Sequence, residues 1–263
     1  MSVTFLLTVI LLILMVIVGG KKGAKSFFNL FLNFIMILFM LILMQMGLDT
    51  IKVTIVFSVI ITSFTLFYIS GVNKKTVCSL LSVMLAVLIT VLMIYNIGIR
   101  SKVQGFGFEQ VESVAYLSLY IKLDFTKLVI CEIIIGLLGA VIDVSISISS
   151  SLNELYENNS SISRKDLAKS GMNIGRDILG TMTNTLFFAY VSEFMTLLIY
   201  FDELHYSISD IINTKIFCGD IFQVLTSGIG VILIIPITSY IMSFFLTFKH
   251  GSDKIVKGDE IHE

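Results

Sequence analysis

One apolar segment, residues 128–152, carries an aspartate near its middle, and the spacing of its other polar residues suggests chemistry. Residues three or four positions apart lie on one face of an α-helix. The polar and small residues at that spacing form what we name the Asp143 stripe: Glu132, Gly136, Gly139, Asp143, Ser147 and Ser150. Because glycines let a neighbouring backbone approach closely, we expect the Asp143 stripe to pack against protein and not against lipid.

At the depth expected for Asp143, a charged carboxyl group is energetically unfavourable. Asp143 lies about nine residues from the inner end of its segment, which at ~1.5 Å per residue places it ~14 Å deep. That is close to the middle of a hydrocarbon core about 30 Å thick. A carboxylate there costs roughly 2.5–3.5 kcal/mol on insertion scales. The carboxyl group of Asp143 is therefore expected either to have a function or to have an interaction partner that satisfies it. Glu132 lies nearer the outer surface.

A second set of polar residues precedes and enters the apolar segment 178–200. Its members share one helical face and form what we name the Asn184 stripe: Asn173, Asp177, Gly180, Thr181 and Asn184. An antiparallel neighbour would bring Asn184 and Thr181 to roughly the depth of Asp143, where both can hydrogen-bond to a carboxyl group. Asp177 is expected near the inner interface and Glu193 further out.

Two interpretations of these residues stay open. In the first, Asp143 takes up and releases a proton or ion. Candidates for this relay are Asp143, Glu132, Asn184, Thr181, Asp177 and Glu193, of which Asp177 and Glu193 also suit interface anchoring. In the second, a protonated Asp143 ties two helices together through Asn184. The glycines expected at helix contacts are Gly136, Gly139, Gly171, Gly175 and Gly180.

The composition shows which elements must position these residues. Of 263 residues, 56% are hydrophobic and 14% charged, against about 25% charged in soluble domains. The mean hydropathy is +0.96. These values predict an all-α, polytopic transmembrane helix bundle that forms a single domain over residues 1–263. Seven spans are expected: about 3–18, 27–46, 53–70, 77–99, 128–152, 178–200 and 221–248. We interpret the first as a span and not as a cleaved signal.

The distribution of Lys and Arg predicts the orientation. Alternate connections and the tail 249–263 carry most of the basic residues: Lys21, Lys22, Lys25, Lys74, Lys75, Arg164, Lys165, Lys169, Arg176, Lys249, Lys254 and Lys257. By the positive-inside rule these lie in the cytoplasm, so the N-terminus is expected outside and the C-terminus inside. The outer connection is expected to hold a short amphipathic helix near residues 108–117, and Ser163 with Asp166 to cap a helix.

Other chemistry is not indicated. The three cysteines, Cys78, Cys131 and Cys218, follow no metal-binding spacing, and the three histidines are scattered. There is no phosphate-binding glycine loop and no nucleophile with a histidine partner inside a span. The net charge of −1 gives no sign of a nucleic-acid partner. We expect no enzyme activity, no cofactor and no metal site.

The stretches GAVIDVSISISSSLNEL and SRKDLAKSGMNIGRDILGTMTNTLFFAYV resemble the YibE/F family of bacterial membrane proteins. The similarity is strongest over residues 105–191, with GFGFEQVES in an outer loop and GKKGAKS after the first span in support. It implies a protein of the bacterial cytoplasmic membrane, of the membrane-only type that tends to accompany a related sister protein. It implies no established biochemical activity.

A weaker resemblance connects the chain to the transmembrane half-bundle of SecD/SecF and the RND superfamily. Asp143 would match the intramembrane aspartate that couples H⁺ or Na⁺ flow to work outside the membrane, and Asn153–Glu154 would match a loop motif. The chain lacks the outer working domain of those proteins. We therefore expect an ion-coupled, transporter-like or energising subunit. The alternative is a non-transporting structural subunit, assembled with a related membrane subunit or as a homo-oligomer.

Overall fold

Helices make up every regular element in the computed structural model, which describes residues 3–101, 125–203 and 205–259. They are α1 (Val3–Gln45), α2 (Thr50–Ser70), α3 (Lys74–Ser101), α5 (Phe125–Asn158), α6 (Arg164–Glu203), α7 (Ile208–Asn213) and α8 (Lys215–Asp259). The expectation of an all-α membrane bundle is confirmed. The amphipathic helix expected near residues 108–117 lies outside the described residues.

Five of these helices are long and apolar enough to cross a membrane, and six if the bent pair Arg164–Ser192 and Leu197–Glu203 forms one span, among the residues that the structure describes. The count of six differs from the expected seven spans only in α1, and the count of five also leaves out α6. The two segments expected at 3–18 and 27–46 belong to the single helix α1, which is broken at Gly20. Gly20 has φ 55° and ψ −135°, a conformation that is favourable only for glycine.

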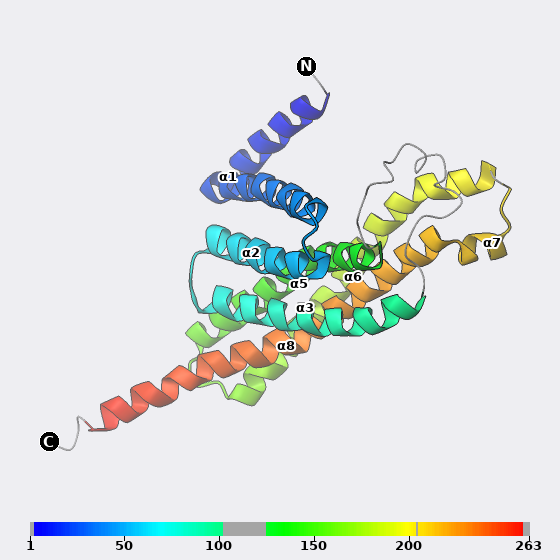
Figure 1. Cartoon of the computed structure of the whole chain (residues 1–263). Coiled ribbons are helices and arrows are strands. Elements are labelled where there is room, and N and C mark those ends of the chain that lie inside the picture. The colour runs from blue at the N-terminus through cyan, green and yellow to red at the C-terminus, as the bar shows by residue number, and fades with distance from the viewer. Residues whose placement is uncertain (1–2, 102–124, 204, 260–263) are drawn as a thin grey trace.

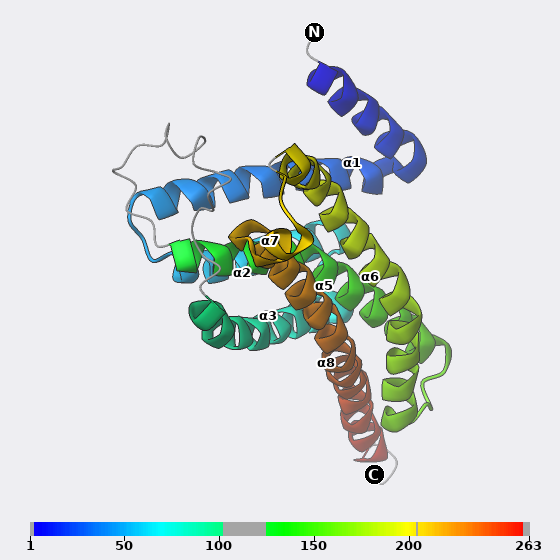
Figure 2. The ribbon, with the colours of Figure 1, turned by 90° about the vertical axis from the view of Figure 1, so that its right-hand side faces the viewer.

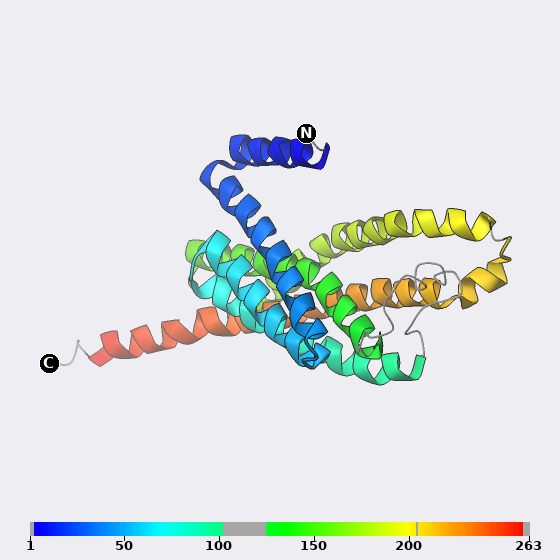
Figure 3. The ribbon, with the colours of Figure 1, turned by 45° about the horizontal axis from the view of Figure 1, so that its top comes forward.

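The part of α1 before Gly20 stands away from the bundle in all three views (Figures 1, 2 and 3). The most apolar stretch of α1 has no buried residue. After the break, α1 packs along α2. Two buried or half-buried asparagines of α1, Asn29 and Asn33, point their amide nitrogens at the hydroxyl of Thr65, at 3.4 and 3.2 Å.

Helix α5 forms the centre of the bundle, with α8, α3, α2 and α6 packed around it. One aliphatic face of α5, which includes Ile134, Leu137, Val141 and Ile148, is fully buried. Small hydroxyl side chains share this buried face. Ser145 lies 3.1 Å from the hydroxyl of Thr238 in α8 and donates to the carbonyl of Ser79 in α3 at 3.4 Å. Buried hydroxyl groups therefore help to join α3, α5 and α8.

Local sequence signals explain where the helices begin and end. Asp49 caps α2 by accepting from the backbone N–H of Lys52 at 3.2 Å, and Gly71 ends α2 with φ 74°. The expected cap of α6 is confirmed: the Asp166 N–H donates to the hydroxyl of Ser163 at 3.2 Å, and that hydroxyl donates to the Asp166 carboxylate at 2.6 Å.

The connections expected to carry basic residues gather at one end of the bundle, which we name the basic end. Lys25 of α1 lies over the ring of Tyr68 near the end of α2, 5.8 Å from its centroid. Lys74 and Lys75, which open α3, share a pocket with Ser160 of the α5–α6 loop. The opposite end holds the ion pair between Lys127 and Asp49, at 3.1 Å.

Candidate functional site

Asp143 lies midway along α5, on the side that faces away from the core. Its side chain is exposed within this chain, whereas Val141, Val144 and Ser145 beside it are fully buried. The hydroxyl of Ser147, one turn further on, donates to the backbone carbonyl of Asp143 at 2.7 Å. Within the described residues the Asp143 carboxyl group itself has no hydrogen bond or ion pair.

The Asp143 stripe as a whole faces outward, which corrects the expectation that it packs against protein in this chain. Glu132, Gly136, Gly139 and Asp143 are all exposed. A Cβ placed on Gly139 would have no atom within 4 Å. The physical reason is that α5 buries its wider aliphatic face, which lies on the opposite side of the helix and offers more apolar area to α3 and α8.

At its Glu132 end the stripe borders an open cavity of about 440 Å³ between α1, α5 and α8. Apolar side chains such as Met40 and Met44 of α1 form one wall. Glu132 and Gly136 of α5 and Gln223 of α8 contribute the polar part of the lining. Pockets that are mostly apolar with a few polar groups are the usual form of a small-molecule or ion-access site.

Gly136 is the member of the Asp143 stripe with close neighbours in this cavity region. A Cβ at Gly136 would lie 2.8 Å from the amide nitrogen of Gln223 and 3.1 Å from the hydroxyl of Tyr190. Tyr190 in turn lies 3.1 Å from the hydroxyl of Ser227. Sequence reasoning missed Gln223, Tyr190 and Ser227. Gln223 carried a usable signal, because an amide inside an apolar span of α8 is as unusual as a carboxylate.

The Asn184 stripe of α6 also faces outward. Its five members, Asn173, Asp177, Gly180, Thr181 and Asn184, are exposed. They lie on the opposite side of α6 from Gly171 and Gly175, which contact α8. The hydroxyl of Thr181 donates to the carbonyl of Ile178 at 2.8 Å, inside its own helix.

The structure does not bring the two stripes together. No hydrogen bond joins Asp143 to Asn184 or Thr181 among the described residues. This separation could not be predicted from membrane depth. Depth gives the position of a residue along the helix axis, but not the direction in which its side chain points. Glu193 belongs to α6, and its side chain lies outside the part that the structure describes.

The glycines expected at helix contacts divide into two groups. A Cβ on Gly175 would lie 2.2 Å from Cγ2 of Ile235, and one on Gly171 would lie 2.7 Å from Oγ of Ser239, both on α8. Gly136 has the close neighbours already described. Gly139 and Gly180 have no atom within 4 Å of an added Cβ. Close packing between α6 and α8 therefore needs Gly171 and Gly175. The neighbours of Gly136 are the ends of flexible side chains, and Gly139 and Gly180 lie on open surface.

The described part of the chain holds no group of three or more His, Cys, Asp or Glu side chains that could bind a metal ion. The chemistry that the site offers is that of two carboxyl groups, those of Asp143 and Glu132. Asp143 is exposed midway along a span, and Glu132 lies in a cavity nearer the end of α5 that carries the Asp49–Lys127 ion pair.

Comparison with known proteins gives one match. The model of a protein family described as YibE/F-like protein matches residues 7–248. No curated protein and no solved structure matches the chain. The similarity to the SecD/SecF half-bundle is not shown by these comparisons and stays a prediction. The matched range includes the Asp143 stripe, the Asn184 stripe and the cavity between α1, α5 and α8.

Proposed function

We propose that this chain, which belongs to the YibE/F-like family, is an ion-coupled transport or energising subunit of a bacterial cytoplasmic membrane, with Asp143 as the coupling carboxyl group. The coupling ion would be H⁺ or Na⁺, and the polypeptide itself would act without enzyme chemistry. The basic end of the bundle would face the cytoplasm.

The observation that supports this proposal is the exposed and unpaired carboxyl group of Asp143 within the described structure. A carboxyl group that ties helices together would be expected to have a hydrogen-bond partner inside the bundle. Asp143 has none there, and Asn184 faces away on α6. A group placed in this way is open to an ion or a water molecule arriving from outside the chain.

Glu132 extends the proposed path. It lies eleven positions before Asp143 on the same stripe, which corresponds to about 16 Å along the helix axis at ~1.5 Å per residue. Between the two carboxyl groups the stripe contains Gly136 and Gly139, so no side chain of the stripe stands between them. The cavity at Glu132 would then give access from the end of the bundle opposite to the basic end.

Ion flux in proteoliposomes tests the role of Asp143. Under an imposed membrane potential, we expect Asp143→Asn to lower H⁺ or Na⁺ flux by at least about tenfold, because the amide cannot take up a proton or balance a cation. The matched control is Glu203→Gln, which neutralises an exposed carboxyl group at the end of α6, outside both stripes. Its flux should stay close to that of the wild type.

One result of the flux measurement would contradict the proposed role of Asp143. Flux that is equal in Asp143→Asn and in the wild type, with both proteins folded, would remove Asp143 from the coupling step. The same comparison is run with and without any subunit that co-purifies, because an energising subunit acts through a partner.

A structural subunit is the second candidate function, and the Asn184 stripe favours it. An outward face with Asn173, Asp177 and Asn184 is costly against lipid and suits an interface with another membrane subunit or a second copy. Gly139 and Gly180, which are open in this chain, would allow close approach of that partner. A stable complex that shows no flux, and that Gly180→Leu separates while Gly19→Leu does not, would support this function over the first.

A further inference from the structure

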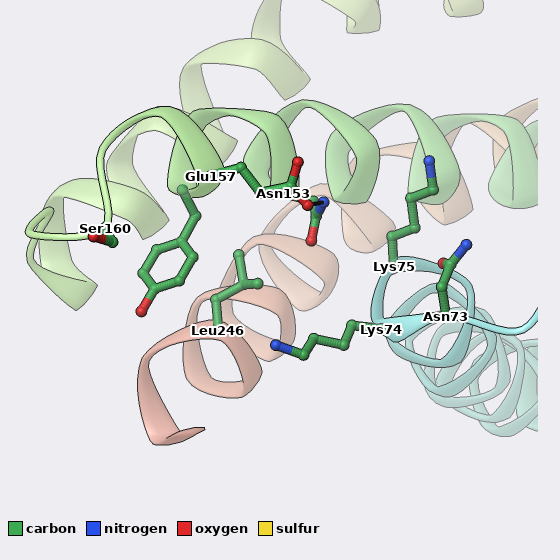
Figure 4. Close-up of a pocket in the computed structure, with 8 residues that line it drawn as sticks. Asn73, Lys74, Lys75, Asn153, Glu157, Ser160 and Leu246 are labelled. Carbon is green, nitrogen blue, oxygen red and sulfur yellow. Dashed lines mark hydrogen bonds between the residues drawn. The ribbon is translucent and has the colours of Figure 1, made fainter. Parts of the chain in front are cut away.

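We infer that the basic end of the bundle holds a binding site for the headgroup phosphate of an anionic phospholipid, in a pocket between α3, α5 and α8. The pocket has a volume of about 510 Å³ and is separate from the Asp143 stripe and from the cavity at Glu132. Figure 4 shows its lining, to which the α2–α3 turn, the start of α3, α5, the α5–α6 loop and α8 contribute.

Two cations define the chemistry of this pocket. Lys74 and Lys75 are the first two residues of α3, and neither makes an ion pair within the described structure. In Figure 4 Lys74 extends on the side of Leu246, whereas Lys75 extends toward Asn153 and α5. The two side chains thus leave the start of α3 in different directions, and both line the pocket.

The start of α3 adds to the attraction for an anion. Asn73 caps this helix by accepting from the Thr76 N–H at 3.2 Å. The first backbone N–H groups of a helix and its dipole favour a negative charge nearby. The cap is satisfied by the chain itself, so the lysines, not the helix end alone, supply the binding charge.

The carboxyl group that lines the pocket, that of Glu157, already accepts a hydrogen bond within the chain. Glu157 accepts a hydrogen bond from the Asn153 amide at 2.7 Å, on the surface of α5. The lining thus has two positive groups and one negative group that is held by a neighbour. This balance favours a singly or doubly negative ligand over a cation.

The position of the pocket favours a lipid over a free anion. It opens at the end of the apolar helices where the headgroups of one leaflet lie, and Leu246 of α8 provides an apolar wall for the start of an acyl chain. Basic pockets between transmembrane helices are typical binding sites for anionic lipid headgroups.

Native mass spectrometry of the full chain tests the site. The protein is purified from nanodiscs that contain equal amounts of phosphatidylglycerol and phosphatidylcholine, and the lipids it retains are counted. We expect the wild type to retain phosphatidylglycerol, and Lys74→Gln with Lys75→Gln to lower that retention by about tenfold. The control is Lys21→Gln with Lys22→Gln, which removes two charges from the same end of the bundle outside the pocket.

A third variant is expected to raise phosphatidylglycerol retention, whereas poor folding would lower it. Glu157→Gln removes the negative charge from the lining and is expected to raise phosphatidylglycerol retention. Equal retention in the pocket variant and in the Lys21/Lys22 control would overturn the proposal. Complete release of the lipid by millimolar inorganic phosphate would assign the site to a free anion and would overturn the lipid assignment.

Discussion

Asp49, which caps α2 at one end of the bundle, shows how neighbouring groups stabilise a charged carboxylate. The backbone N–H of Lys52, followed by the ammonium group of Lys127, holds the pKa of Asp49 below its ordinary value of 3.8. A folded-state pKa below the unfolded-state pKa stabilises the fold above the unfolded-state value. That contribution disappears as the pH falls through the lower, folded-state pKa.

The first prediction follows from the lowered pKa of Asp49 in the folded protein. Asp49→Asn should lower the Tm at pH 7 by a small amount, because the amide can still cap α2 but cannot pair with Lys127. The difference in Tm between the two proteins should shrink as the pH falls below 3.8. Thermal melts in detergent between pH 7 and pH 3 measure it. A difference that grows on acidification would contradict the assigned pKa direction.

At the same scale, spacing predicted which residues of α5 share a face but not where that face points. Glu132, Gly136, Gly139 and Asp143 do form one stripe, as their three- and four-residue intervals require. Whether a polar stripe is turned inward depends on the competing face, and α5 has a larger aliphatic one. The hydroxyl of Ser145 on that buried face gave no sequence signal, because Ser is common on both kinds of face.

At the scale of the element, the contact between α6 and α8 depends on two glycines. Gly175→Ala should destabilise the protein by roughly 1–3 kcal/mol, because the new methyl group overlaps the branched side chain of Ile235, whose Cγ2 would lie 2.2 Å away. Gly180→Ala is the matched control. It has open space around it and should be neutral or stabilising by up to about 1 kcal/mol through helix propensity.

Denaturant or thermal unfolding of the two variants in detergent separates these outcomes. Ile235→Ala should cost less stability in the Gly175→Ala background than in the wild type, since it removes carbon atoms that the new methyl group meets. If Gly175→Ala and Gly180→Ala have the same stability, α8 does not approach α6 as closely as the structure indicates.

The five helices α2, α3, α5, α6 and α8 could be placed from apolar run length, within a few residues at most ends. Helix α6 departs most at its start, because its apolar run begins at about residue 178, yet the helix begins at Arg164. Helix α8 likewise continues to Asp259, well past the expected end at residue 248. Hydropathy detects the membrane-embedded part of a helix, whereas the Ser163 cap sets the true start of α6. The continuity of α1 across Gly20 could not be predicted from hydropathy either, because the basic stretch after Gly20 resembles a loop.

At the scale of the whole molecule, the basic residues that the sequence places in alternate connections lie together at one end of the bundle. Residues far apart in the chain, such as Lys25, Lys74 and Arg164, belong to the same end of the bundle, and Arg164 lies 4.7 Å from the ring centroid of Phe244 in α8. The alternation of basic and less basic connections therefore has a physical counterpart in the fold. An anionic leaflet would favour this end by about 1 kcal/mol per basic residue near its surface.

The orientation of the chain can be measured by cysteine labelling of intact cells. In a background with Cys78, Cys131 and Cys218 replaced by Ala, single cysteines are placed at Ser160 in the basic end and at Leu48 in the opposite end, both exposed. If the basic end faces the cytoplasm, a membrane-impermeant maleimide labels Leu48→Cys in intact cells and labels Ser160→Cys only after permeabilisation. The reverse pattern would place the cavity at Glu132 on the cytoplasmic side, and ions would then reach Asp143 from that compartment.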